Sequence, residues 1–163
     1  MSIVQNLENI KKELTNNNIN SKIIAVSKTF DLSYIQPLID HGHLVYGENR
    51  VQEAKKKWEQ ILSSNNNIEI HLIGSLQSNK AKDAVKLFKF IHSVDREKLV
   101  DALASAEKAL GLKRKYFLQV NTGDEKQKSG SSKGDIEKLY YFAKNKLDIV
   151  GLMCIPPVDD DSK

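Results

Sequence analysis

Ile23-Ile24-Ala25-Val26-Ser27-Lys28 is the first strand-like segment of this chain. It is a short apolar run between polar residues, which is typical of a strand buried on both faces. Five more such runs follow, and the intervals between them have helical periodicity. This alternation predicts βαβ units and a parallel sheet. We expect six strands, at residues 22–28, 44–46, 68–73, 90–94, 116–121 and 149–155.

Helices are predicted for the intervals. Three of these intervals carry apolar residues at the i, i+3, i+4, i+7 spacing that forms one buried helix face. In the first of them, Trp58 and Ile61 should pack on the outside of the sheet. A further helix, Ile3 to Leu14, should precede the first strand. Helix boundaries are marked by possible N-caps and C-terminal glycines at Asp31, Ser78, Asp95, Gly42 and Gly111.

Six βα units fit either an open doubly wound sheet or a barrel, and the alternation of side chains distinguishes the two. In the third strand Ile70 and Leu72 share one face, whereas His71 lies on the other. In the fifth strand Gln119 and Asn121 share a face. A sheet face covered by helices has little use for such polar residues, but a barrel interior that opens into a site accommodates them. We therefore predict a barrel.

Composition narrows the class of protein. The 163 residues form one predicted domain, 1–163, with a formal charge of +4 that is spread along the chain and too small to indicate a nucleic-acid partner. No apolar run approaches the roughly 18 residues that span a membrane. The single cysteine, Cys154, cannot form an internal disulfide, and no metal site is expected at the four histidines. We expect a cytoplasmic protein.

Four short motifs occur in a fixed order along the chain. They are Ala25-Val26-Ser27-Lys28, Gly47-Glu48-Asn49-Arg50-Val51-Gln52-Glu53, His71-Leu72-Ile73-Gly74-Ser75-Leu76-Gln77-Ser78-Asn79-Lys80 and Lys128-Ser129-Gly130. The arrangement resembles the pyridoxal phosphate homeostasis protein family, single-domain barrels similar in fold to the barrel domain of bacterial alanine racemase. The resemblance implies a (β/α)8 TIM-type barrel that binds pyridoxal 5'-phosphate (PLP).

The resemblance also implies the site. The lysine of the first motif holds the cofactor covalently in that family, which implies a Schiff base on Lys28. An amine at a barrel mouth can attack an aldehyde, although a lysine at the end of a strand is more often simply solvated.

Two further residues are candidates for cofactor contact. Asn49 is one, and its alternative role is the N-cap of a helix beginning at Arg50. His71 is the other, and a core histidine is the more common outcome for such a residue. Lys128 lies on a loop near the predicted site. Ser75 stands where family members often have proline, and we interpret it as a loop variation without consequence for the cofactor.

The strand count departs from the resembled family. A barrel of this kind has eight strands and typically about 250 residues, whereas only six of eight βα units are found here. We expect a barrel truncated after strand 6, without the usual phosphate-binding loops after strands seven and eight. The first and sixth strands would then be unpaired edges, which favours self-association.

Three functions remain open at this point. The first is a non-catalytic PLP carrier or buffer in intracellular PLP homeostasis, with PLP-dependent apoenzymes as possible partners. The second is an amino-acid racemase, which needs an acid/base group on each face of the substrate. The third is an RNA-binding or scaffolding module, which would bind with a steep salt dependence.

Overall fold

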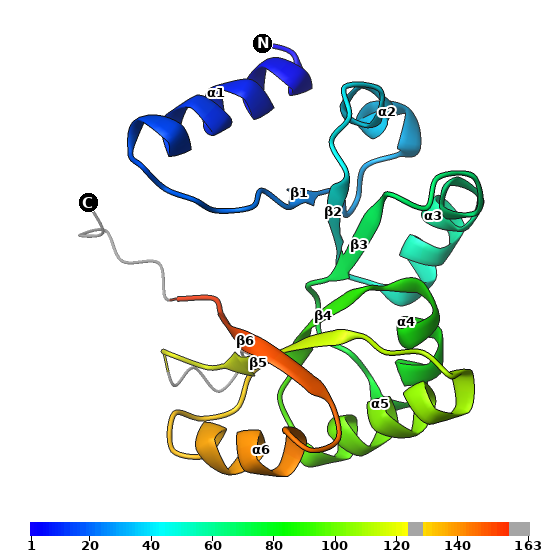
Figure 1. The fold of residues 1–163 in the computed structure, drawn as a ribbon, viewed down its shortest axis with the longest axis vertical. Coiled ribbons are helices and arrows are strands. Elements are labelled where there is room, and N and C mark those ends of the chain that lie inside the picture. Colours follow the sequence, from blue (N-terminus) through cyan, green and yellow to red (C-terminus); the bar gives the residue numbers. More distant parts are fainter. Residues whose placement is uncertain (124–128, 157–163) are drawn as a thin grey trace.

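The computed structural model describes residues 1–123 and 129–156. It contains one six-stranded sheet whose strands are all parallel and follow the chain order β1 to β6 (Figure 1). The strands are β1 (Ala25–Val26), β2 (Val45–Glu48), β3 (Glu69–Leu72), β4 (Phe90–Val94), β5 (Lys115–Val120) and β6 (Asp148–Cys154).

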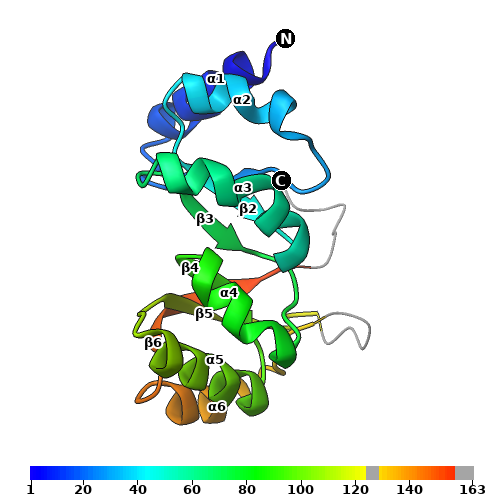
Figure 2. The ribbon, with the colours of Figure 1, turned by 90° about the vertical axis from the view of Figure 1, so that its right-hand side faces the viewer.

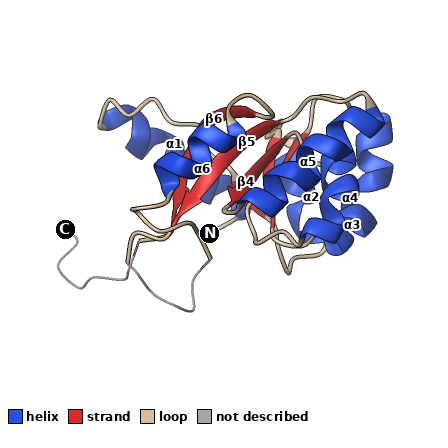
Figure 3. Cartoon of the chain, turned by 90° about the horizontal axis from the view of Figure 1, so that it is seen from below, coloured by secondary structure: helices blue, strands red, loops and turns tan. Residues whose placement is uncertain are grey.

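One helix precedes β1, and the others connect successive strands. They are α1 (Ile3–Asn16), α2 (Leu32–Asp40), α3 (Val51–Ser64), the short 3-10 helix η1 (Ser78–Lys80), α4 (Ala81–Leu87), α5 (Glu97–Leu110) and α6 (Ile136–Ala143). Figures 2 and 3 show α2 to α5 as one layer along the outer face of the sheet. The right-handed crossover of each βα unit accounts for this one-sided covering, and it confirms the predicted barrel-type architecture.

The core lies between the sheet and this helix layer. Trp58 of α3 is fully buried against Tyr46 of β2, and Ile61 packs at its border, as predicted. Ile70 and Leu72 of β3 are also buried in the core. None of the helices among the described residues is both long and apolar enough to cross a membrane.

The predicted ends of several elements were wrong. Strand β1 was predicted over 22–28 but covers only Ala25–Val26, which pair with Tyr46 and Gly47 of β2. The N-cap of α5 is Arg96 rather than Asp95, and Ser78 begins η1 instead of capping it. Asp95 is instead ion-paired with Arg96. Gly111 does end α5 in the left-handed conformation (φ 63°), as its sequence position predicted.

Strands β1 and β6 each have one strand neighbour within the described part of the chain. Leu152 of β6 is paired with the buried Leu118 of β5, yet its own side chain is 64% exposed. Val150, two residues earlier on the same strand, is 42% exposed. The last strand therefore presents an apolar surface that no described helix covers.

Candidate functional site

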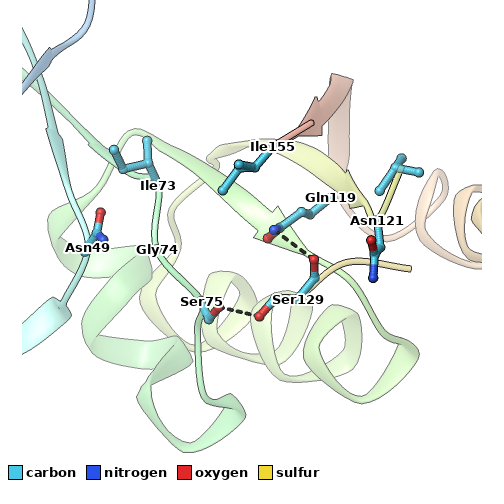
Figure 4. Close-up of a pocket in the computed structure, with 9 residues that line it drawn as sticks. Asn49, Ile73, Gly74, Ser75, Gln119, Asn121, Ser129 and Ile155 are labelled. Carbon is cyan, nitrogen blue, oxygen red and sulfur yellow. Dashed lines mark hydrogen bonds between the residues drawn. The ribbon is translucent and has the colours of Figure 1, made fainter. Parts of the chain in front are cut away.

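The carboxyl ends of the strands bring the sequence motifs together, since parallel strands all end at the same edge of a sheet. A pocket of about 220 Å³ lies at this edge (Figure 4). It is lined by Asn49, Ile73, Gly74, Ser75, Gln119, Val120, Asn121, Ser129 and Ile155. The loops after β2, β3 and β5 thus meet here, and their polar side chains are amides and hydroxyls.

Lys28 lies two residues beyond β1 and is exposed. The sequence alternation predicted that Lys28 shares the face of Ile24, but in the structure Lys28 stands in the turn after β1, next to the buried Ser27, so the direction of its side chain stays a prediction. The face of Ile24 is the inner one, because a Cβ added to Gly47 would lie 3.1 Å from both Ile24 and the pocket residue Ile73. Lys28 is at the rim of the same edge but is not among the residues that line the pocket.

Asn49 lines the pocket, and the capping alternative was wrong. Helix α3 begins at Val51 with Arg50 as its N-cap, so Asn49 lies outside the cap and its amide is presented to the pocket (Figure 4). The loop after β3 approaches very closely: a Cβ on Gly74 would lie 2.7 Å from the Cα of Asn49. Only glycine at position 74 allows this approach, which fixes the position of the Asn49 backbone.

His71 lies on the inner face of β3 but below the pocket, and it is not brought together with Asn49. Its ring stacks on Phe90 at 4.3 Å, and its Nδ1 is 2.9 Å from Nε2 of His92. His92 in turn stacks on Phe117 at 4.3 Å. These four rings pack together on the inner face, and His71 is 7% exposed, so it is a buried, packed histidine. Its contact with a cofactor ring stays a prediction.

Burial sets the charge state of the two histidines. Desolvation lowers the pKa of His71 to about 4, with smaller contributions from His92, Lys22 and Lys89. Desolvation also lowers the pKa of His92 to about 4. Both rings are therefore neutral at physiological pH, and one of them donates the hydrogen bond that joins them.

The far wall of the pocket comes from β5 and the segment after it. Gln119 is 5% exposed and donates from Nε2 to the carbonyl oxygen of Ser129 at 3.2 Å. A carbonyl can only accept, so this bond fixes which end of the amide is nitrogen. The other end, Oε1, is buried and has no hydrogen-bond partner among the residues described. The Oγ atoms of Ser75 and Ser129 are 2.7 Å apart and join the third motif to the fourth (Figure 4).

The polar inner face was predicted from the alternation in β5, and the positions of Gln119 and Asn121 in the pocket confirm it. Lys128, also considered from the sequence, lies outside the described residues. Ser75 and Ser129 as pocket residues were not predicted. Their only sequence signal is that each stands beside a glycine in a motif. Within residues 1–123 and 129–156 no three potential metal ligands cluster.

Comparison with known proteins identifies the fold and the family. The sequence profile of the alanine racemase N-terminal domain family matches residues 1–163. The pyridoxal phosphate homeostasis protein of Haemophilus influenzae is 34% identical over 98% of this chain and 68% of its own length. The protein of the same name from Aquifex aeolicus is 34% identical over 84% of this chain and 60% of its own length.

Solved structures agree. PipY of Synechococcus elongatus without PLP has a TM-score of 0.86 and 33% identity, covering 97% of this chain and 73% of PipY. PipY with PLP bound has a TM-score of 0.72 and 34% identity, covering 86% of this chain and 65% of PipY. The alanine racemase of Clostridium difficile, at 15% identity and a TM-score of 0.65, shares the fold over 93% of this chain and 41% of its own. The chain spans about two thirds of the length of these homeostasis proteins and belongs to the pyridoxal phosphate homeostasis protein family, within the alanine racemase N-terminal domain family.

Proposed function

We propose that this chain binds PLP through a Schiff base on Lys28 and acts in intracellular PLP homeostasis as a carrier or buffer of the cofactor. The observation that carries the proposal is the position of Lys28, at the same strand edge as the pocket and beside the loop of Asn49. Relatives named for PLP homeostasis, and a PipY structure with PLP bound, support it.

The residues present fit part of the cofactor. The buried Oε1 of Gln119 is an acceptor that an N–H or O–H group of a ligand would satisfy, and the amide of Asn49 faces the same space. The phosphate is different. Barrels usually bind it with loops after strands seven and eight, and the described chain has six strands. We propose that these residues hold the ring and the aldehyde end.

PLP supplies an aldehyde. Lys28 is the residue whose amine would hold this aldehyde, as a Schiff base. Racemisation would also need an acid/base group on each face of the substrate α-carbon. Among the described residues that line the pocket, none has a side chain that titrates near neutral pH. This composition favours a carrier over a racemase, and the carrier would deliver PLP to PLP-dependent apoenzymes in the cytoplasm.

The test is chemical trapping. The chain is mixed with PLP, the imine absorbance is recorded, and borohydride then reduces the adduct for peptide mapping. The label should map to Lys28 and disappear in Lys28→Ala, whereas Lys80→Ala should label normally. A label on Lys80 or Lys128 in the wild-type chain would show that the nucleophile is misassigned. Production of D-alanine from L-alanine would instead support the racemase.

Affinity should depend on the phosphate site. The 163-residue chain should bind PLP more weakly than a relative with strands seven and eight, since each charge-assisted hydrogen bond to the phosphate contributes roughly 1.5–3 kcal/mol. Titration of this chain and of PipY with PLP, with light scattering to follow self-association, measures the difference. Equal affinity in a monomeric chain would place the phosphate site within these residues.

A further inference from the structure

The sheet alone holds Lys28 weakly. Strand β1 pairs with β2 through two residues only, Ala25 and Val26. After Ser27 the chain turns sharply, and Thr29 has a left-handed backbone with φ 65°. A two-residue edge strand followed by a turn has few ladder bonds, so something else must fix the main chain from which Lys28 projects.

Ser27, directly before Lys28, is held at every polar atom. Its N–H donates to the carbonyl oxygen of Gly47 at 2.9 Å, and its Oγ donates to Oε1 of Glu48 at 2.8 Å. Its carbonyl oxygen accepts from Nζ of Lys57 at 2.6 Å. The Ser27 side chain itself is 1% exposed.

The carboxylate oxygen that accepts from Ser27 Oγ also accepts two other hydrogen bonds. Oε1 of Glu48 accepts from Nζ of Lys57 at 2.8 Å and from Nε1 of Trp58 at 2.9 Å. Glu48 is 1% exposed and Lys57 is 13% exposed, whereas the neighbours Lys55 and Lys56 are exposed. A buried ion pair costs desolvation and contributes little net stability, so its presence calls for a specific reason.

We infer that Glu48 and Lys57 are positioning residues that hold Ser27, and through it the Lys28 amine, in the geometry for attack on the PLP aldehyde. The network joins Glu48 to Lys57 and Trp58 of α3 and so lies on the helix side of the sheet. Lys28 is predicted to face the opposite, inner side, so neither Glu48 nor Lys57 needs to touch the cofactor. Lys57 links Ser27, Glu48 and helix α3 into one rigid unit. This inference rests on the proposed function.

The test compares three lysine and two glutamate variants of the 163-residue chain. Lys57→Met removes the donor and keeps the apolar stem, Lys57→Arg keeps the charge and supplies other N–H donors, and Lys56→Met is the matched control on the exposed neighbour. Glu48→Gln is matched by Glu107→Gln, which alters another buried carboxylate distant from Lys28 along the chain. The rate of imine formation is measured at a temperature where each variant remains folded, and borohydride labelling reports the fraction of adduct on Lys28.

Lys57→Met and Glu48→Gln should slow imine formation by about tenfold or more, as misplacement of a reacting group does. Their label should also spread to other lysines. Lys57→Arg should recover most of the rate, and Lys56→Met and Glu107→Gln should match the wild type. If Glu48→Gln does not fold, the three lysine variants still decide the question.

Two results would overturn the inference. Lys57→Met with wild-type rate and labelling would show that the network is structural only, and a loss of rate in Glu107→Gln equal to that in Glu48→Gln would attribute the effect to general destabilisation. The proposed function fails separately, if the wild-type chain forms no adduct on Lys28.

Discussion

Two buried carboxylates hold opposite ends of the sheet, and they are built differently. Glu48 stands at the carboxyl end of β2 and Glu107 on α5 near the amino end of β5, each almost fully buried. Glu107 accepts from the backbone N–H of Arg114 at 2.6 Å and from the Tyr116 hydroxyl at 3.0 Å, one on each side of the first residue of β5. Glu107 therefore fastens a helix to the strand that follows it.

Their lysine partners show the contrast most clearly. Lys113, which pairs with Glu107, has 81% of its side chain exposed, whereas Lys57, which pairs with Glu48, has 13% exposed. An exposed ion pair is screened by water and contributes little. The Glu48 pair is shielded, and its bonds end on the residue before Lys28. In barrels the amino end of the strands usually serves stability and the carboxyl end serves function, and these two networks follow that division.

The largest expected effect is on stability. Glu48→Ala should lower the free energy of unfolding by about 3–5 kcal/mol, since it leaves the Lys57 ammonium, the Trp58 N–H and the Ser27 hydroxyl without their shared acceptor. Glu107→Ala should cost less, about 1–3 kcal/mol, because Lys113 returns to water and the groups left without their acceptor, the Tyr116 hydroxyl and the Arg114 N–H, are uncharged. Urea denaturation measures both. Equal losses, or a larger loss for Glu107→Ala, would contradict the distinction drawn between the two networks.

A second effect is expected from His71 and His92, which are neutral, in contrast to the two ion pairs. Burial lowers the pKa of His71 and of His92 from 6.5 to about 4, so the unfolded chain binds more protons than the folded chain between these values. The stability that this burial contributes is therefore fully present above pH 6.5 and is lost as the pH drops toward 4. Unfolding free energies across this range test the prediction.

The control for this prediction is His71→Asn combined with His92→Asn. The double variant should lose less stability between pH 6.5 and 4 than the wild-type chain does. Lys22 and Lys89 oppose protonation of His71 and remain in the variant. An unchanged pH dependence would mean that the histidines are not the groups responsible.

Much of the fold follows from local sequence patterns. The alternation in the third strand predicted which face His71 takes, and the helical stripe around Trp58 predicted the outer layer, because strand and helix periodicities are properties of neighbouring residues. The length of β1 could not be predicted this way. The two residues of β1 pair with Tyr46 and Gly47, further along the chain, and local periodicity does not encode how far such a pairing extends.

The site was less predictable than the fold, for a similar reason. Lys57 is one of three consecutive lysines, and the sequence gives no sign that only this one reaches the Ser27 carbonyl, thirty residues earlier. Glu48 resembles any acidic residue at a strand end. Contacts between loops that are distant in sequence decide both roles, so the motifs indicate where the chemistry lies without indicating what holds it in place.

The smallest effect expected tests the close approach of two loops at the carboxyl edge. Gly74→Ala would bring a Cβ against the backbone of Asn49. Backbone atoms cannot move aside as the end of a flexible side chain can. The cost should be roughly 1–2 kcal/mol, within the usual range for overpacking.

Gly134→Ala is the matched control, since its Cβ would meet only the Ser132 Oγ at 3.8 Å. Because Asn49 lines the pocket, Gly74→Ala should also weaken PLP binding, whereas Gly134→Ala should leave both stability and binding near their wild-type values. Thermal denaturation and PLP titration of the two variants measure these differences. Wild-type binding by a folded Gly74→Ala chain would show that the position of Asn49 does not matter to the ligand.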